Sequence, residues 1–158
     1  MERVKVTQEG YDRLMEKLED FKGRGRREVA DDLEEARSHG DLRENADYDA
    51  AKEKQGMLEA QIRLYEDHLG RADVVNVKTL NTNRVYFGLI VKFENLNTDK
   101  ILEYQIVSEL EADLKQKRIS ATAPIIRPLL GRSVGDIVEI HLESGDIDIE
   151  ILNISLPS

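Results

Sequence analysis

The sequence predicts an α+β protein in which an N-terminal antiparallel helical hairpin is followed by a domain built on an antiparallel sheet. Three observations support this prediction. Apolar residues recur at steps of three and four until the mid-seventies, the recurrence then changes to steps of two or short apolar runs, and turn-rich segments separate those runs. We expect the hairpin at residues 1–75, with an acidic tip at 38–45, and the second domain at 76–158.

The first helical arm is expected to begin after Thr7, because a threonine side chain suits the N-cap position. Its apolar stripe consists of Leu14, Leu18, Phe21, Val29, Leu33 and Ala36. Gly23 and Gly25 interrupt this stripe, and each costs about 1 kcal/mol of helix propensity relative to alanine. We therefore expect a bend or a frayed patch in this part of the arm.

The second arm carries a heptad seam, the pattern of helices that pack side by side. The seam has one polar member and consists of Ala51, Gln55, Leu58, Ile62, Tyr65 and Leu69. Because only the short segment 38–42 separates the arms, they are expected to fold back antiparallel. Gly70 suits the end of the second helix.

The second domain is predicted from short segments with the composition and period of strands. These segments are 72–77, 84–93, 101–107, 136–142 and 146–152. The links 94–100 and 143–146 are rich in turn residues, which favours pairing of neighbouring strands. Residues 109–120 and 123–131 are interpreted as turns and a short helix.

Composition excludes several classes of function. Cysteine is absent, so the chain has no disulfide framework and no cysteine nucleophile. No run approaches the roughly 20 apolar residues of a membrane span, and the first residues do not resemble a signal peptide, so a cytoplasmic protein is expected. The net charge of −9 argues against clamping duplex DNA through its phosphates. His68 and His141 have no clustered partners in the sequence, so no zinc site is expected.

The acids Asp41 and Glu44 lie at the bend, ahead of a run without a helix breaker until Gly56. Their spacing resembles a capping box, so they can cap the second helix. Two carboxylates also suit a hard cation such as Mg²⁺, although two are too few for a tight site without ligands from a partner. Both interpretations stay open, since one acid can cap while the other coordinates.

Several residues near the bend are candidates for contact with nucleic acid. The cations Arg37, Arg43, Lys52 and Lys54 either form an ordinary solvated helix face, or some of them hold an RNA or DNA phosphate beside the acids. Tyr48 either stacks on a base or occupies the seam between the helices. The sequence shows no P-loop, dinucleotide fingerprint or nucleophile elbow, so a self-sufficient enzyme is not expected.

Residues 35–56, EARSHGDLRENADYDAAKEKQG, closely resemble the Gre transcript-cleavage factors of bacterial RNA polymerase. The DYDAAKEKQ portion is more similar to the GreA type than to the GreB type. The resemblance extends to VTQEGYDRLMEKLE near the start and to ISATAPIIRPLLGRSVGD before the final strand pair, and so covers essentially the whole chain.

This resemblance implies an accessory transcription elongation factor whose FKBP-like second domain docks at the mouth of the polymerase secondary channel while the hairpin enters it. Asp41 and Glu44 would help hold a second Mg²⁺ shared with RNA polymerase, and no cofactor would be held by the chain alone. The polymerase would then hydrolyse backtracked nascent RNA near its 3′ end. Arg37 and Lys52 are the first candidates for contact with that RNA. A monomer without membrane contact and without prolyl isomerase activity is expected.

Two alternatives remain. A channel-occupying regulator would bind the polymerase without stimulating cleavage, although the intact Asp41 and Glu44 argue against it. A plain coiled-coil interaction module would use these acids only as caps. Ala123, Ile126 and Pro128 depart from the family pattern, which leaves the details of docking open.

Overall fold

The computed structural model describes residues 2–40 and 45–158. The chain forms two compact units, Asp12–Arg71 on one hand and Met1–Tyr11 with Ala72–Ser158 on the other. The predicted division at residue 75 places the first eleven residues with the hairpin, whereas they pack with the sheet. The cause is a strand near the N-terminus, β1 (Val4–Thr7), that the sequence did not predict.

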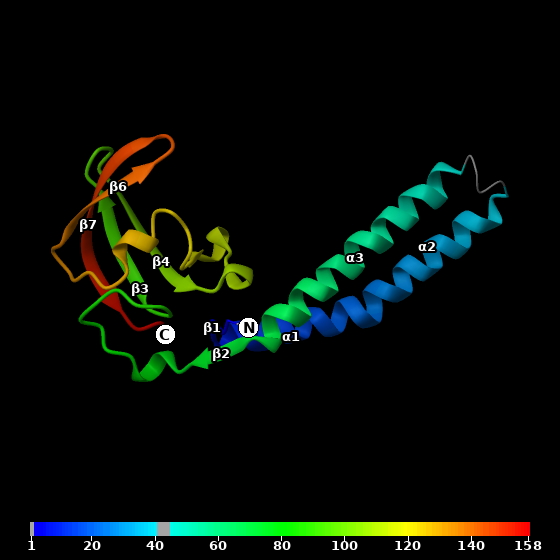
Figure 1. Ribbon diagram of the computed structural model, residues 1–158, viewed down its shortest axis with the longest axis horizontal. Coiled ribbons are helices and arrows are strands. Elements are labelled where there is room, and N and C mark those ends of the chain that lie inside the picture. Colours follow the sequence, from blue (N-terminus) through cyan, green and yellow to red (C-terminus); the bar gives the residue numbers. More distant parts are fainter. Residues whose placement is uncertain (1, 41–44) are drawn as a thin grey trace. The chain divides into compact units, whose positions relative to one another are not determined.

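The helical unit is built from α1 (Gln8–Asp20), α2 (Arg26–Ser38) and α3 (Ala46–Gly70) (Figure 1). A π-helical segment, Phe21–Gly25, joins α1 directly to α2, so the first arm is one continuous helical run. No helix among the described residues combines the length and apolar character that spanning a membrane requires. The predicted helical hairpin is confirmed.

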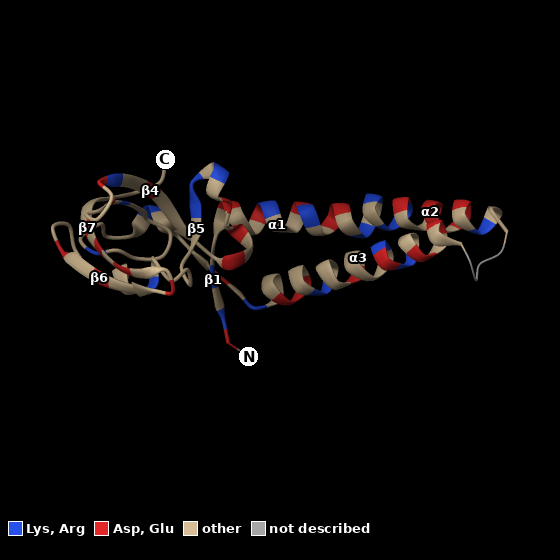
Figure 2. Ribbon diagram, turned by 90° about the horizontal axis from the view of Figure 1, so that it is seen from above, with Lys and Arg blue, Asp and Glu red and all other residues tan. Residues whose placement is uncertain are grey.

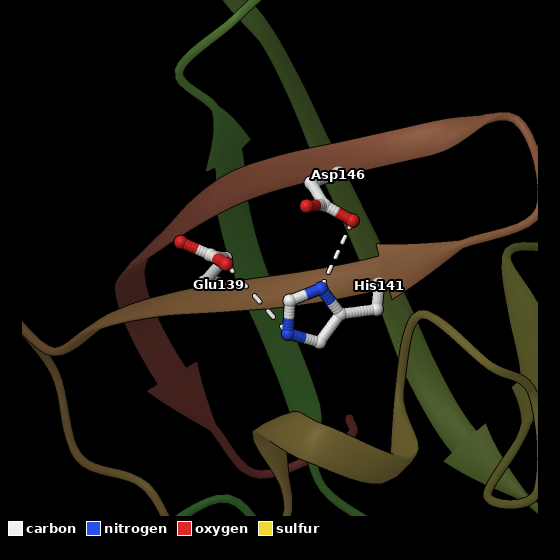
Figure 3. Close-up of side chains that lie close together, drawn as sticks. All are labelled: Glu139, His141 and Asp146. Atoms are coloured by element: carbon white, nitrogen blue, oxygen red, sulfur yellow. Dashed lines mark hydrogen bonds and ion pairs between the residues drawn. The ribbon is translucent and has the colours of Figure 1, made fainter.

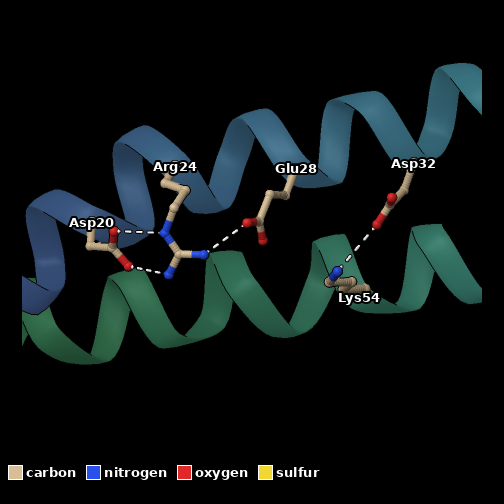
Figure 4. A network of polar contacts seen from close by, with 5 residues as sticks. All are labelled: Asp20, Arg24, Glu28, Asp32 and Lys54. Carbon is tan, nitrogen blue, oxygen red and sulfur yellow. Dashed lines mark hydrogen bonds and ion pairs between the residues drawn. The ribbon is translucent and has the colours of Figure 1, made fainter.

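Ion pairs between the arms show that they run antiparallel. They join Lys22 to Glu66 at 3.4 Å, Arg26 to Glu59 at 2.8 Å and Lys54 to Asp32 at 3.1 Å. Residue numbers rise along one arm and fall along the other. Figure 2 shows acidic and basic residues interleaved along the arms, and Figure 4 shows the Asp32–Lys54 pair bridging them. Because these pairs are solvent-exposed, they specify alignment and add little stability.

The apolar seam between the arms agrees with the predicted heptad pattern. On α3, Ala51, Ile62, Tyr65 and Leu69 are buried, while Gln55 and Leu58 are half-buried. The first arm contributes the buried side chains of Leu14, Leu18, Val29 and Ala36. Phe21 packs edge-on against Tyr65, with 5.2 Å between the ring centroids. Burial of this narrow stripe is the main stabilising term for the hairpin.

The expected bend or frayed patch at Gly23 and Gly25 is instead an ordered π turn. Arg24 bridges its two ends, with contacts of 2.7 Å to Asp20 and 2.8 Å to Glu28 (Figure 4). The hydrogen bond from Arg24 lowers the pKa of Asp20. A Cβ atom on Gly25 would lie 3.2 Å from Leu58 Cδ1, whereas one on Gly23 would meet nothing within 4 Å. Only Gly25 is therefore needed for close approach of the arms.

The other unit contains a five-stranded sheet in the order β5-β4-β3-β7-β6. Its strands are β3 (Ile90–Asn95), β4 (Lys100–Val107), β5 (Arg118–Ser120), β6 (Ile137–Leu142) and β7 (Gly145–Ser155). All neighbours pair antiparallel except β4 and β5, which are parallel. The predicted α+β class with an antiparallel-rich sheet is confirmed, while β5 falls in a segment expected to be turns and helix.

Two strand predictions need correction. Ala72–Val75 (β2) is a strand, but it pairs in parallel with β1 in a separate two-stranded sheet. Residues 84–89 are not a strand, because Gly88 turns the chain with φ +91° and a Cβ there would lie 2.3 Å from Val77. The alternating burial that suggested a strand is real, since Val85, Phe87 and Leu89 all enter the core.

The three departures from the family pattern are explained by packing within this unit. Ile126 is fully buried, and Ala123 packs against the same core. Pro128 lies in the first turn of the short 3-10 helix Arg127–Leu129, where its missing N–H is not needed. This helix and the turns at Glu109–Glu111 and Leu114–Gln116 agree with the predicted turns and short helix.

A buried carboxylate connects the start of α1 to the turn that follows β4. Glu111 is 5% exposed and accepts hydrogen bonds from both the N–H and the hydroxyl of Thr7 and of Ser108. Thr7 Oγ1 in turn accepts from Gly10 N at 3.0 Å, which confirms Thr7 as the N-cap of α1. A Cβ on Gly10 would lie 1.8 Å from the Glu111 carboxylate, so only glycine fits beside it.

The two glycines of the π turn provide a matched test of arm packing. Gly23→Ala is expected to raise the free energy of unfolding by up to about 1 kcal/mol, because alanine is the better helix former. Gly25→Ala is expected to gain less, since Leu58 must move to admit the methyl group. Urea unfolding followed by circular dichroism measures both, and equal stabilisation would contradict close approach at Gly25.

Candidate functional site

The candidate site is the tip of the hairpin, where α2 ends and α3 begins. Of the predicted residues, Asp41, Arg43 and Glu44 lie outside the described part of the chain. Arg37 is the next-to-last residue of α2, and Tyr48 and Lys52 lie in the first two turns of α3. The described part of the tip therefore consists of the chain up to Gly40 and from Asn45 onward.

Asn45 is the N-cap of α3 and also a link between the arms. Its Oδ1 accepts from Tyr48 N at 3.0 Å, and its Nδ2 donates to the carbonyl of Ala36 at the end of α2. The sequence-based hypothesis placed Asp41 at the N-cap of this helix, but Asn45 occupies that position, and Asp41 itself lies outside the described residues. The signal for the correct cap was present, since Asn45 precedes the first-turn acids Asp47 and Asp49.

Backbone hydrogen bonds also cap the C-terminus of the preceding helix, α2. His39 N donates to Ala36 O and Gly40 N donates to Arg37 O, both at 3.2 Å. Gly40 has φ +102°, a left-handed conformation that suits glycine after a helix. The His39 ring lies 3.4 Å from the Asp47 carboxylate across the tip. Hydrogen bonds thus hold both the C-terminal end of α2 and the N-terminal end of α3.

The described candidates for RNA contact differ in their surroundings. Arg37 is exposed, and no described residue forms an ion pair with it. Lys52 is exposed and donates only to the neutral Gln55 side chain, at 3.1 Å, among the residues that the structure describes. Tyr48 is half-buried. Within the described part of the chain, Arg37 and Lys52 therefore have no carboxylate partner, whereas Lys54 pairs with Asp32.

A groove of about 290 Å³ lies between the arms beside the tip. Its lining consists of Asp32, Glu35, Ala36, His39, Asp47, Ala50, Ala51 and Lys54. The charged groups are mostly acidic, and two pairs span the groove, His39 with Asp47 and Lys54 with Asp32. The groove is therefore a part of the arm-to-arm contact, and its lining does not include Arg37, Tyr48 or Lys52.

The sequence-based statement that His141 lacks clustered partners is wrong. Its ring lies 2.9 Å from Asp146 and 3.6 Å from Glu139 in the hairpin formed by β6 and β7 (Figure 3). Glu139 and His141 are two positions apart, and the register of the two strands places Asp146 opposite His141. Glu139, His141 and Asp146 all lie on the β6–β7 hairpin and not at the tip of the helical hairpin.

Comparison with known proteins finds two family models along the chain. The model described as "Transcription elongation factor, N-terminal" matches residues 4–74, and "Transcription elongation factor, GreA/GreB, C-term" matches residues 80–156. Transcription elongation factor GreA of Yersinia pestis is 43% identical over 155 residues, covering 98% of each chain. GreA of Chlorobaculum parvum is 46% identical over 154 residues, covering 97% of each.

Among solved structures, the GreA factor homolog 1 (Gfh1) protein of Thermus thermophilus is similar to this chain. It is 30% identical, and the match covers 96% of this chain and 98% of that chain with a TM-score of 0.45. The prokaryotic transcription elongation factor GreA/GreB from Nitrosomonas europaea is 18% identical, covering 98% and 99% of the two chains, with a TM-score of 0.41.

The cap of α3 can be tested directly. Asn45→Ala is expected to lower the free energy of unfolding by about 1–2 kcal/mol, because both the N-cap bond and the bond to Ala36 are lost. Asp41→Asn with Glu44→Gln is expected to leave stability nearly unchanged. Thermal unfolding by circular dichroism measures both proteins, and a larger loss in the double variant would restore the capping hypothesis.

Proposed function

The chain belongs to the GreA/GreB family of transcription elongation factors and is of the GreA type, and from this membership we propose that it binds bacterial RNA polymerase through the secondary channel. There the factor stimulates cleavage of backtracked nascent RNA by the polymerase, which rescues arrested complexes. The bond-breaking activity belongs to the polymerase, and the chain acts as an accessory factor.

The observation that carries this proposal is the cap formed by Asn45. If Asp41 capped α3, as a plain coiled-coil module would require, its carboxylate would be occupied by backbone N–H groups. Asn45 takes that position, so helix capping gives no reason for the two acids between Gly40 and Asn45. The N-cap of α3 therefore does not depend on Asp41, which supports a role for the two acids toward a partner.

The donor set of the tip fits a magnesium ion that the polymerase shares. Mg²⁺ prefers oxygen ligands and commonly takes one or two carboxylates, completing its shell with water and phosphate oxygens. Asp41 and Glu44 supply such ligands, but two carboxylates bind Mg²⁺ only weakly without help. When bound between factor and polymerase, Mg²⁺ lowers the pKa of its water and offsets charge developing on the phosphate.

The proposed role of the acids is to complete a metal site and to orient the attacking water. Negative charge at this point also keeps the tip from binding RNA phosphates by itself. Arg37 and Lys52 flank the acids and have no described carboxylate partner, so they are the proposed contacts for the extruded RNA. Arg43 and Tyr48 are further candidates, the first for a phosphate and the second for stacking on a base.

Cleavage of RNA in a stalled, backtracked polymerase complex tests this proposal. Asp41→Asn or Glu44→Gln is expected to reduce stimulated cleavage at least about a hundredfold, because each removes a charged metal ligand. Raising Mg²⁺ is expected to recover part of the lost rate. Asp49→Asn is the matched control, since Asp49 is an exposed acid in the first turn of α3. This variant should stimulate cleavage as strongly as the unaltered chain.

Binding of each variant to the polymerase separates the possible outcomes. If Asp41→Asn and Glu44→Gln bind the polymerase normally but no longer stimulate cleavage, the result supports the proposal that the two acids serve as metal ligands in the polymerase complex. If the unaltered chain binds the polymerase and occupies its channel without shortening the RNA, it is a channel-occupying regulator and the proposal fails. If it does not bind at all, the hairpin serves another interaction.

The side chains of Arg37 and Lys52 are expected to help position the RNA and to have little effect on the hydrolysis step itself. Arg37→Ala and Lys52→Ala should each raise the factor concentration needed for half-maximal cleavage several-fold, with a smaller change in the maximum rate. This loss should shrink as salt rises, because salt weakens a phosphate contact in the unaltered chain and the variant no longer has that contact. Lys54→Ala is the control, because Lys54 pairs with Asp32. Equal effects at Lys52 and Lys54 would point to general charge instead.

A further inference from the structure

Three polar side chains of the β6–β7 hairpin lie on one face of the sheet, remote in sequence from the tip. Residues two apart on a strand share a face, so Glu139 and His141 project to the same side of β6. Asp146 of β7 is the register partner of His141 and shares that face. One ligand atom from each of the three lies within 4.8 Å of the other two.

The two carboxylates approach different nitrogens of the imidazole. Asp146 Oδ1 lies 2.9 Å from Nδ1, a hydrogen-bond distance, and Glu139 Oε1 lies 3.6 Å from Nε2 (Figure 3). A hydrogen bond from Nδ1–H to Asp146 places the lone pair of the neutral ring on Nε2. This lone pair then faces the Glu139 carboxylate, and two electron-rich atoms face each other with no donor between them.

A cation between Nε2 and Glu139 removes this repulsion. Zinc binds imidazole nitrogen and carboxylate oxygen at about 2.1 Å, and tetrahedral geometry then separates the two ligand atoms by about 3.4 Å. The observed separation of 3.6 Å is close to that value. A carboxylate that accepts the second N–H of a metal-binding histidine is also the usual outer partner in zinc sites, and Asp146 has this position.

We propose that Glu139 and His141 form a surface site for a divalent cation of the zinc class, with Asp146 as the positioning residue that fixes the imidazole. The three side chains are 61%, 72% and 63% exposed in chain order, so the remaining coordination positions are open to water. Imidazole selects a cation of this class over Mg²⁺, which prefers oxygen alone. The site lies on a different element from the acids of the tip.

Protons compete with the metal for His141. The hydrogen bond from Asp146, its charge and the charge of Glu139 raise the pKa of the His141 ring. A protonated ring also satisfies both carboxylates, so the metal must displace a proton to bind. Binding is therefore expected to strengthen as pH rises, because loss of the ring proton frees the nitrogen for the metal.

Calorimetric titration of the full chain with zinc chloride tests the site. The unaltered chain is expected to show one saturable site that His141→Gln abolishes and Glu139→Gln weakens at least about tenfold. Asp146→Asn is expected to weaken it about tenfold without changing the stoichiometry, as for outer partners of other zinc sites. The matched control is His39→Gln, because His39 is an exposed histidine beside the single carboxylate of Asp47.

Two further measurements identify the ligand. In NMR spectra, the ring protons of His141 should shift with zinc and reach a plateau, while those of His39 stay in place. The site should persist in Asp41→Asn with Glu44→Gln, which separates it from any metal held at the tip. Zinc binding that survives His141→Gln, or the absence of a saturable site, would overturn the proposal and leave a protonated histidine between two acids.

Discussion

The carboxylate of Glu111 is the contact on which the start of the helical arm depends. Four donors from Thr7 and Ser108 converge on its two oxygens, so a charge removed from water is compensated entirely by hydrogen bonds. Thr7 also caps α1 through Gly10 N, which means that one side chain both begins the helix and binds the carboxylate. Losing either partner would leave a buried charge or an unpaired donor, and each is far costlier than the bond itself. The β1–β2 ladder, the first turn of α1 and the turn after β4 therefore form a single hydrogen-bonded network.

The hairpin depends on different forces. Its core is a single apolar seam, and its surface is covered with charges of both signs whose pairs are screened by water. The seam provides stability, and the paired charges on opposite arms together with the close approach at Gly25 favour one register. At the far end, Asn45 completes this alignment by joining the first turn of α3 to the last turn of α2. Hydrogen bonds thus hold both described sides of the tip, the end of α2 up to Gly40 and the start of α3 from Asn45.

The sequence was informative wherever a local rule decided the structure. Thr7 as a cap and the seam on α3 follow from side-chain chemistry and period, and both were predicted. Contacts between distant segments were not predictable in this way: β1 is four residues long and exists because β2 pairs with it. Residues 84–89 misled the prediction because a turn at Gly88 can bury alternate residues as a strand does. At the tip the residue types were predicted, but Asn45 rather than Asp41 proved to be the cap, since two adequate caps compete within five residues and only the helix start decides between them.

The number of donors that the chain offers to a carboxylate distinguishes the roles of its acids. Glu111 is saturated by its own chain and is structural. Asp32 and Glu59 each meet one cation of the opposite arm and specify alignment. Glu139 faces an imidazole nitrogen that is itself an acceptor when neutral, so the chain leaves room for a proton or a metal ion. At the tip, Asn45 already fills the N-cap position of α3, so capping of that helix does not require Asp41. A carboxylate that its own chain does not satisfy must be satisfied by water or by a ligand.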